Sequence, residues 1–248
     1  MQTYENTFYD SHPFDWVQRY RPDELLDTVP PVLAAAIEKA SESALIVDIG
    51  CGAGRVVSYM AWKGLRCIGL DLSRVSVELM ARRTGRPGLI ANNLQLPLRD
   101  ECVDLLISDG VIHHTEDPFR GFAENCRVLK RGGSLYLAVY KPGGRYQALY
   151  KHPGSLIRRL LHSLAGKLVV YATMVPVYYF AHVLKSKGKI TWGGAKNLFH
   201  DYFVTPRVVF LSKGEIESWC RRCGVNIADY DANPRLNVHS FLLQKVGR

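Results

Sequence analysis

A buried strand that leads directly into a glycine loop constrains this chain more than any other feature. Residues 47–55 read VDIGCGAGR, an apolar run that ends on an Asp and places glycines at positions 50, 52 and 54. Glycine at every second position lets the backbone approach a ligand, and the helix expected next adds the positive end of its dipole. A dinucleotide fingerprint reads G-x-G-x-x-G, and the place of its third glycine is not filled here. The loop therefore predicts an anionic or zwitterionic cofactor and leaves a nicotinamide dehydrogenase as a rival.

Short apolar runs alternate with helical stretches on both sides of this loop. Strands are expected at 44–50, 66–73, 88–93, 102–110, 134–140, 225–231 and 237–246. Helices are expected at 31–41, 55–63, 73–83, 118–130 and 213–224, and an RGG sequence closes the helix that begins at Pro118. Continuous apolar strands between helices predict an α/β fold with a mostly parallel sheet covered on both faces. The short turn ANPR before the last strand predicts an antiparallel hairpin.

An acidic residue ends the second predicted strand. Asp71 lies twenty-one residues beyond Gly50. Open parallel sheets bind ligands beyond the carboxyl ends of their strands, and a carboxylate there can accept hydrogen bonds from both hydroxyls of a ribose. Glycines that only turn the chain, with an Asp71 that only caps a helix, are the plain alternative. The order of the two features favours an adenosine cofactor.

Four blocks, in this order, resemble the class I S-adenosylmethionine-dependent methyltransferases, and among them the type 11-like group. The blocks are VDIGCGAGR, IGLDLS, NNLQLPLRDECVDLLISDGVIHH and RVLKRGGSLYLAVY. The last block has Arg131 where the family usually has Pro. The resemblance covers about residues 44–140 and 213–246. It implies a Rossmann-like sheet of seven strands whose last strand is antiparallel, a long insertion after the fifth strand, and S-adenosylmethionine as the cofactor.

The resemblance also implies a set of cofactor-binding residues: Asp48, Gly50, Cys51, Gly52, Gly54, Asp71, Leu72, Asn92, Asn93 and Asp109. Asp48 and the glycines line the methionyl part, Asp71 takes the ribose and Leu72 packs on adenine. Asn92 stands where the family usually has an Asp near the adenine amino group, and its carbonyl oxygen can still accept a hydrogen bond. Asn93 offers its backbone N–H to the ring, and Asp109 faces the methionyl ammonium group.

Three residues are candidates for catalysis: His113, His114 and Tyr140. An imidazole at the mouth of the sheet could take a proton from a hydroxyl acceptor at neutral pH. The two histidines could instead tether their loop, and the tyrosine could simply pack. In an in-line displacement, alignment of the reacting atoms lowers the barrier by up to ~7–11 kcal/mol, whereas a general base raises the rate by ~10²–10⁴-fold. Methyl transfer therefore does not require an obvious base. The pair CRRC at 220–223 has no second Cys or His pair at ligand spacing, so no metal is expected.

The excess positive charge lies in one internal segment. The chain has a net charge of +9, and twelve Lys/Arg against one acid lie between Lys141 and Lys213. This contrast divides the chain into an N-terminal helical cap (1–43), a cofactor-binding core (44–140), a basic, aromatic helical insertion (141–212) and the C-terminal part of the core (213–248). Candidate acceptor contacts, from their placement alone, are Lys141, Arg145, Tyr146, His200, Asp201 and Tyr202.

The insertion favours a lipophilic acceptor. Residues Leu168–Leu184 are uncharged, but they are fewer than the ~20 that a membrane-spanning helix needs and are interrupted by Pro176. Three roles fit this segment. It could contact an anionic membrane peripherally, cover an apolar acceptor tunnel as a lid, or form a helical lid whose apolar face only packs in the protein core. A quinone, an isoprenoid, a lipid or a secondary-metabolite precursor is the favoured small-molecule acceptor.

Two alternatives to a lipophilic acceptor stay open. RNA is the first, because a basic segment with Trp192, Phe199, Tyr202 and Phe203 suits a single strand. ISDGVIHH together with VFLSKGEIESWCRRCG also resembles tRNA wobble-uridine methyltransferases. The second alternative is a module that binds the cofactor without catalysis. The N-terminal sequence lacks the pattern of an export signal and the six cysteines form no framework, so a cytoplasmic location is expected, with contact at the inner face of a membrane.

Overall fold

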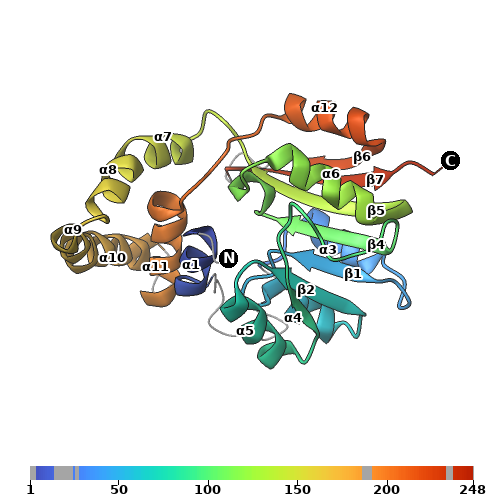
Figure 1. Ribbon diagram of the computed structural model, residues 1–248, viewed down its shortest axis with the longest axis horizontal. Helices are drawn as coiled ribbons and strands as arrows, with labels where there is room; N and C mark the ends of the chain where they lie inside the picture. Colours follow the sequence, from blue (N-terminus) through green and yellow to red (C-terminus); the bar gives the residue numbers. More distant parts are fainter. Residues whose placement is uncertain (1–3, 14–24, 26–27, 186–191, 233–236, 248) are drawn as a thin grey trace. The chain divides into compact units, whose positions relative to one another are not determined.

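The computed structural model describes the chain except for residues 1–3, 14–24, 26–27, 186–191, 233–236 and 248 (Figure 1). The chain divides into two compact units. Unit 1 comprises residues 1–13, 19–142 and 207–248, and unit 2 comprises residues 14–18 and 143–206. Unit 2 therefore falls almost entirely within the segment 141–212, where the sequence predicts an insertion.

Unit 1 contains a seven-stranded sheet of order β3-β2-β1-β4-β5-β7-β6 (Figure 1). The strands are β1 (Ile46–Ile49), β2 (Cys67–Asp71), β3 (Gly88–Ile90), β4 (Val103–Asp109), β5 (Leu129–Tyr140), β6 (Val225–Asp231) and β7 (Val238–Lys245). The first five strands pair in parallel, whereas β7 is antiparallel to both β5 and β6. This confirms the predicted Rossmann-like sheet. Strand order reverses between β1 and β4, so a ligand is expected at the carboxyl ends of β1, β2 and β4.

Helices cover both faces of this sheet. They are α3 (Pro31–Glu38), α4 (Arg55–Trp62), α5 (Arg74–Thr84), α6 (Pro118–Val128) and α12 (Lys213–Cys223). Unit 1 also contains α1 (Tyr4–Ser11), which packs on α5, and a 3₁₀ turn, η1 (Ile112–His114). One hydrophobic cluster holds residues of α6 and α12, and a second holds residues of α3, α4 and α5. Neighbouring strand residues divide between the clusters: Leu106 belongs to the first, and Leu105 and Ile107 belong to the second. This alternation is the period-two pattern of a strand buried on both faces.

The end of α6 differs from the prediction. The sequence predicts a helix to residue 130 that RGG closes, but β5 already begins at Leu129, which pairs with Val103. The pairing register shifts between Val103 and Leu105, and Gly132 has φ +76°. The RGG sequence therefore forms an irregularity inside the strand rather than a helix end. The turn ANPR lies mostly outside the described residues.

The regular elements described in unit 2 are all helices. Its elements are α7 (Arg145–Lys151), α8 (Pro153–Leu160), α9 (Leu164–Val169), the π-helical η2 (Val170–Met174), α10 (Val175–Lys185), α11 (Trp192–Phe199) and the π-helical η3 (His200–Val204). Its core is small and rich in aromatic rings: Ile157, Val170, Val175, Phe199 and Phe203. This agrees with the expected mainly helical insertion.

Pro176 does not interrupt the apolar helix, so that expectation was wrong. α9, η2 and α10 follow one another without a gap. The Val175 N–H bonds to the carbonyl of Val170, one residue further back than in an α-helix. A π turn directly before the proline accommodates its ring and its missing N–H. The resulting stretch, Leu164–Leu184, has 21 residues and a mean hydropathy of 1.3, and by length and composition alone it is the one helix in the described chain that could cross a membrane.

Candidate functional site

The glycine loop turns β1 into α4 with three glycines in left-handed conformations that strain other residues. Gly50, Gly52 and Gly54 have φ values of +64°, +52° and +91°. A Cβ on Gly50 would lie 2.5 Å from Cγ2 of Val111, and one on Gly54 would lie 2.7 Å from Cγ of Met80. Gly54 is the N-cap of α4 and has no side chain to cap it. The N–H groups at this helix end therefore suit the carboxylate of a ligand.

Asp71, the last residue of β2, is held between the glycine loop and the start of α5. One carboxylate oxygen accepts from the Gly52 N–H at 2.9 Å and the other from the Ser73 N–H at 2.8 Å. Burial raises the pKa of Asp71, and these two N–H bonds oppose the shift. Each oxygen keeps a second lone pair, so both can still accept from the hydroxyls of a ribose.

Three carboxylates gather around the loop with one guanidinium. Burial raises the pKa of Asp48 well above its usual range; Arg55 lowers it, and Asp109 and Asp71 raise it further. Arg55, which was not predicted as a site residue, pairs with Asp109 at 2.5 Å and also donates to the carbonyl of Thr28. Asp109, expected to receive a ligand's ammonium group, therefore already has a partner. The only signal for Arg55 was its place directly after the last glycine.

The residues expected around adenine occupy different environments. Asn92 is exposed, and its side-chain oxygen accepts from the Leu94 N–H at 2.9 Å, which leaves one lone pair for a ligand. Asn93 is buried, and its amide has no partner within the described chain. Leu72 is half-buried. Cys51 is buried within the loop, where burial raises the pKa of its thiol well above the ordinary value.

These groups fit S-adenosylmethionine better than a dinucleotide. Asp71 is an acceptor placed for ribose hydroxyls, and the N-terminus of α4 suits a methionyl carboxylate. Asp48 interacts electrostatically with Asp71 and Asp109, and Arg55 is the cation close to Asp48 and Asp109. A sulfonium gains from the remaining negative charge, whereas a pyrophosphate would be repelled by it.

The three candidate catalytic residues lie together. The His113 ring centroid is 4.1 Å from that of Tyr140 and 4.3 Å from that of His114. The His113 carbonyl accepts from the Val209 N–H at 2.8 Å, and His114 Nδ1 lies 2.8 Å from the carbonyl oxygen of Arg207. The histidines thus join their loop to the segment before α12, as the tethering alternative requires. The same contacts also fix the imidazoles, so a catalytic role stays a prediction.

His114 is better placed to accept a proton than His113. Burial lowers the pKa of His114 to about 4, so the ring is neutral at neutral pH. A carbonyl only accepts, so Nδ1 carries the hydrogen and Nε2 keeps a free lone pair. Burial also lowers the pKa of His113, whose side chain is sealed and whose ring nitrogens have no partner among the described residues.

Unit 2 buries three of the six candidate acceptor contacts. Tyr146, His200 and Asp201 are interior residues. The Tyr146 hydroxyl donates to the carbonyl of Asp201 at 2.9 Å, and the Tyr202 ring packs 4.5 Å from that of Tyr146. Buried side chains offer no surface to an acceptor, so the structure contradicts this expectation for these three. The others, Lys141, Arg145 and Tyr202, are exposed or half-buried and stay predictions.

The CRRC pair meets a third cysteine. Cys223 on α12 interacts through its thiol with Cys126 on α6, and this interaction lowers the pKa of Cys223 to about 7 and raises that of Cys126. Cys220 is buried beside them. Across the residues that the structure describes, no group of three or more His, Cys, Asp or Glu is arranged to hold a metal ion.

The match to a known family falls within unit 1. Residues 47–137 match the family described as "Methyltransferase domain". The human "Probable tRNA methyltransferase 9B" is 35% identical over 113 residues, which is 44% of this chain and 24% of that protein. The tRNA (carboxymethyluridine(34)-5-O)-methyltransferase of Arabidopsis thaliana is 31% identical over 113 residues, 44% of this chain and 27% of that protein. The malonyl-acyl-carrier-protein O-methyltransferase of Methylococcus capsulatus is 30% identical over 105 residues, 39% of this chain and 38% of that protein. The chain spans about a quarter of the length of the two tRNA-related proteins.

Two solved structures share the fold over most of their length. One is a chain from the complex of the Haloferax volcanii Trm112 methyltransferase activator with a methyltransferase, with a TM-score of 0.57, 18% identity and coverage of 94% of this chain and 96% of that one. The other is magnesium protoporphyrin IX methyltransferase from Synechocystis PCC 6803 with bound SAH, with a TM-score of 0.58, 13% identity and 97% coverage of both chains. At these identities the likeness concerns the fold alone.

Proposed function

We propose that this chain, whose residues 47–137 match a methyltransferase-domain family, is an S-adenosylmethionine-dependent methyltransferase that transfers the cofactor's methyl group to a small lipophilic acceptor. The observation that carries the proposal is the Asp71 carboxylate, which bridges the ends of β1 and β2 and keeps lone pairs for a ribose. A quinone, an isoprenoid, a lipid or a secondary-metabolite precursor fits the apolar character of the insertion after β5. Contact with the inner face of a membrane accompanies such an acceptor.

The chain's own residues would bind the cofactor, align the acceptor with it and remove a proton from the acceptor. When bound, the cofactor supplies an activated methyl carbon, and alignment of the nucleophile with it contributes up to ~7–11 kcal/mol. Asp71 holds the ribose, and Asp48 offsets the positive charge of the sulfonium. His114 Nε2 accepts the proton of a hydroxyl acceptor, while its Nδ1–H stays bonded to the Arg207 carbonyl. Tyr140 packs beside both imidazoles and helps to fix their planes.

Labelled cofactor tests this function. The protein is incubated with methyl-labelled S-adenosylmethionine and with lipid and aqueous extracts of the source cell. We expect label in the lipid extract with the wild type and much less with Asp71→Ala at a cofactor concentration that does not saturate the variant. Label confined to an aqueous extract would overturn the acceptor class. Calorimetry with S-adenosylhomocysteine and with NAD tests the cofactor separately, and preferential binding of NAD would overturn methyl transfer itself.

Methylation of tRNA is the second candidate function. Two relatives of the domain are named as tRNA methyltransferases, and unit 2 is basic. Their similarity is confined to 113 residues, whereas unit 2 exposes many apolar side chains that RNA binding would not use. Labelled methyl on tRNA, together with a salt-dependent mobility shift, would favour this candidate. A non-catalytic module would bind S-adenosylhomocysteine and label no fraction.

A further inference from the structure

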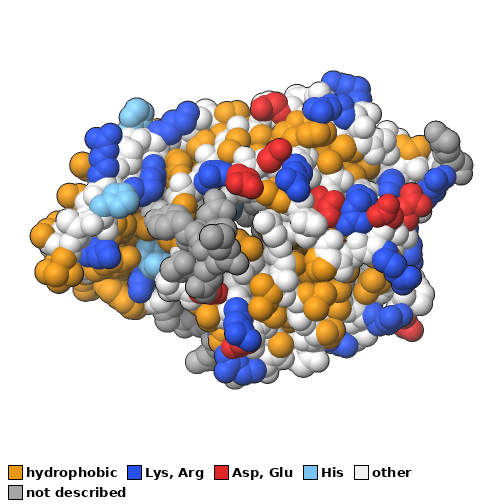
Figure 2. All heavy atoms as spheres, viewed as in Figure 1, with side chains coloured by type: hydrophobic (Ala, Val, Ile, Leu, Met, Phe, Trp, Pro, Cys, Tyr) orange, Lys and Arg blue, Asp and Glu red, His pale blue; other side chains and the backbone are white. Residues whose placement is uncertain are grey.

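The apolar helix of unit 2 presents an uncovered apolar face to its surroundings. Six large hydrophobic side chains between residues 164 and 184 are 48–82% exposed: Leu164, Leu168, Val169, Val177, Phe180 and Leu184. Leu164 and Leu168 are four residues apart, and Val177, Phe180 and Leu184 follow one another at intervals of three and four. The exposed Ala172 and Thr173 lie in the interval between Val169 and Val177, so these side chains form one side of the helix, here called the outer face. Figure 2 shows hydrophobic side chains gathered where α9 and α10 lie in Figure 1.

The outer face is free of charge and of unsatisfied hydroxyls between residues 168 and 184. Thr173 is the one exposed polar side chain in this stretch, and its hydroxyl donates to the carbonyl of Val169 at 2.6 Å. Apart from Thr173 and the large hydrophobic side chains named above, the exposed residues there are Ala172 and Ala181. A helix of this length presents about 30 Å of apolar surface. Patches of this extent on a protein surface mark an interaction site.

The inner face of the same helix is already used. Val170 and Val175 are buried in the core of unit 2 with Phe199 and Phe203. The Tyr178 ring lies edge-on to both phenylalanines, at 5.5 and 5.9 Å. A helix that crossed a bilayer would have to give up this packing. The geometry therefore favours a helix that lies in the plane of an apolar–water interface and keeps its packing against the rest of unit 2.

The positive charge of unit 2 indicates which kind of apolar surface the outer face contacts. Residues 143–206 contain nine Lys/Arg and one acidic residue, Asp201, which is buried. Arg145, Lys151, Arg159 and Lys167 are exposed on the helices that precede or flank the outer face. A cationic surface beside an apolar helix complements an anionic phospholipid bilayer, and each cation near such a surface adds to the attraction. A second copy of this chain would bring another cationic surface and be repelled.

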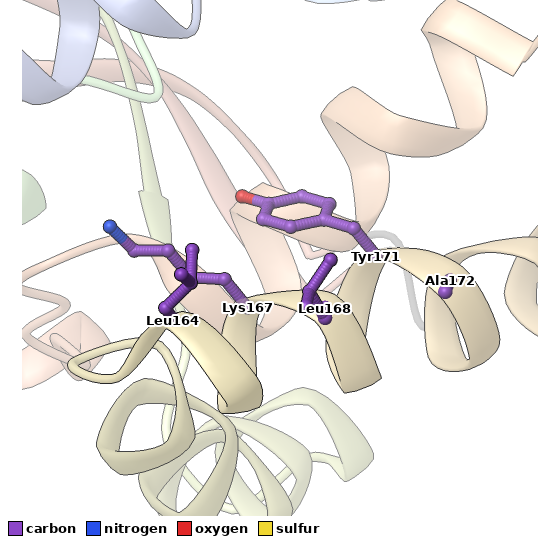
Figure 3. A pocket seen from close by; sticks show the side chains of 5 residues that line it. All are labelled: Leu164, Lys167, Leu168, Tyr171 and Ala172. Atoms are coloured by element: carbon purple, nitrogen blue, oxygen red, sulfur yellow. The ribbon is translucent and has the colours of Figure 1, made fainter.

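A shallow hollow on the helix is lined by apolar side chains and a cationic side chain. It has a volume of about 360 Å³ and is lined by Leu164, Lys167, Leu168, Tyr171 and Ala172. Figure 3 shows the Lys167 ammonium group and the Tyr171 hydroxyl extending the same way from the helix. Lys196 lies 5.7 Å from the centroid of the Tyr171 ring. The Tyr171 hydroxyl already bonds to His200 Nε2 at 3.1 Å, so Lys167 is the cation that lines the hollow, with Lys196 close to the ring. A cation beside leucines suits a phosphate headgroup with its chains alongside.

We propose that the outer face of Leu164–Leu184 lies in the headgroup boundary of an anionic bilayer, with Lys167 at the lipid phosphates. The inference deepens the proposed function and rests on it, since a lipophilic acceptor gives bilayer contact its use. By binding the bilayer, unit 2 would bring the methyltransferase domain to the membrane in which a lipophilic acceptor dissolves.

Vesicle co-sedimentation of the full chain tests this proposal. Mixed phosphatidylglycerol–phosphatidylcholine vesicles are compared with pure phosphatidylcholine vesicles, without acceptor or added cofactor. We expect binding to the mixed vesicles and a loss of about tenfold on the neutral vesicles or at ~0.5 M salt. The double variant Val177→Glu/Phe180→Glu should bind the mixed vesicles about tenfold less. Val246→Glu, at an apolar residue of unit 1 that is 48% exposed, is the matched control and should bind like the wild type.

Three results would overturn the proposal. They are equal binding of the double variant and the wild type, equal binding to neutral and anionic vesicles, and a dimer in lipid-free buffer that the double variant abolishes. Affinity for S-adenosylhomocysteine, measured on every variant, shows that unit 1 remains folded. If vesicle binding fails while label still enters a lipid extract, this inference falls and the proposed function stands. If vesicle binding holds while no fraction is labelled, the proposed function falls instead.

Discussion

The Asp71 carboxylate accepts a hydrogen bond from the Gly52 N–H at 2.9 Å, so one side chain joins the end of β2 to the loop after β1. The same carboxylate is the expected ribose ligand. Its second oxygen accepts from the Ser73 N–H at the start of α5. Asp71 therefore ties the glycine loop to the start of α5, and in the proposed function it also contributes acceptors to the cofactor site.

Substitution of Asp71 should weaken cofactor binding strongly. Asp71→Asn keeps the shape but turns one acceptor into an N–H₂ that faces a backbone donor, and Asp71→Ala removes both acceptors. Hydrogen bonds to a charged group contribute about 1.5–3 kcal/mol, so we expect a loss of roughly tenfold to 150-fold in affinity for S-adenosylhomocysteine. Calorimetry measures it, with the exposed Glu42→Ala as control. Unchanged affinity in Asp71→Ala would remove the ribose assignment.

Asp48→Asn should stabilise the cofactor-free protein while weakening cofactor binding. Burial raises the folded-state pKa of Asp48 above 3.8, so the folded state keeps its proton to higher pH than the unfolded chain. Stability therefore falls as pH rises from about 4 towards the folded-state pKa, and the amide removes this loss. A gain of about 1 kcal/mol corresponds to roughly 2–4 °C in Tm for a chain of this size. Thermal denaturation should show a gain that grows with pH; a gain independent of pH would contradict this account.

The stability of the protein should fall on acidification partly through His114. The unfolded ring gains a proton near 6.5, but burial lowers the folded-state pKa to about 4. The unfolded state binds more protons between these values, so stability is lost as pH falls through this window. His114→Asn keeps an N–H donor for the Arg207 carbonyl and does not titrate. Its Tm should depend less on pH between about 4.5 and 6.5, and parallel Tm profiles would show that His114 charges freely in the folded state.

Asp10 should hold α1 on the N-terminus of α5. Its Oδ1 accepts from the Ser73 hydroxyl at 2.7 Å, and Ser73 in turn caps α5 by accepting from the Ser76 N–H at 3.2 Å. Removal of such a capping acceptor costs about 1 kcal/mol. Hydrogen exchange over residues 4–11 should be faster in Asp10→Ala. Asp10→Asn retains the oxygen and should show a smaller change; equal exchange in Asp10→Ala and wild type would rule out this anchoring role.

Cys223 should be alkylated faster than Cys102, which is also half-buried. The interaction with Cys126 is the main cause that lowers the pKa of Cys223, so a larger share of Cys223 than of an ordinary thiol is thiolate at neutral pH. Iodoacetamide labelling read by mass spectrometry should therefore favour Cys223. In Cys126→Ala we expect the rate at Cys223 to fall about threefold to tenfold. A rate that does not respond to this change would mean that Arg222 or solvent exposure sets the reactivity.

Local patterns predicted the framework of the site. Glycines at 50, 52 and 54 need positive φ, and an acid ends the next strand, so the crevice and Asp71 could both be placed from neighbouring residues. The strand and helix order followed from periods of two and 3.6, which depend only on residues close in the chain. The end of α6 was misplaced because RGG suits a helix end as well as a bulge, and only the pairing of Leu129 with Val103 distinguishes them.

Contacts between distant residues were decided by the tertiary structure. Arg55 pairs with Asp109, Asp10 reaches Ser73, and His114 bonds to a carbonyl 93 positions away. The sequence by itself determined the type and order of the strands and helices, because backbone conformation and polarity pattern are local properties. Which side chains share a carboxylate, a carbonyl or a core depends on the order in which strands join the sheet and on how far apart in the chain their ends lie. That order is a property of the whole fold and is absent from any short stretch of residues.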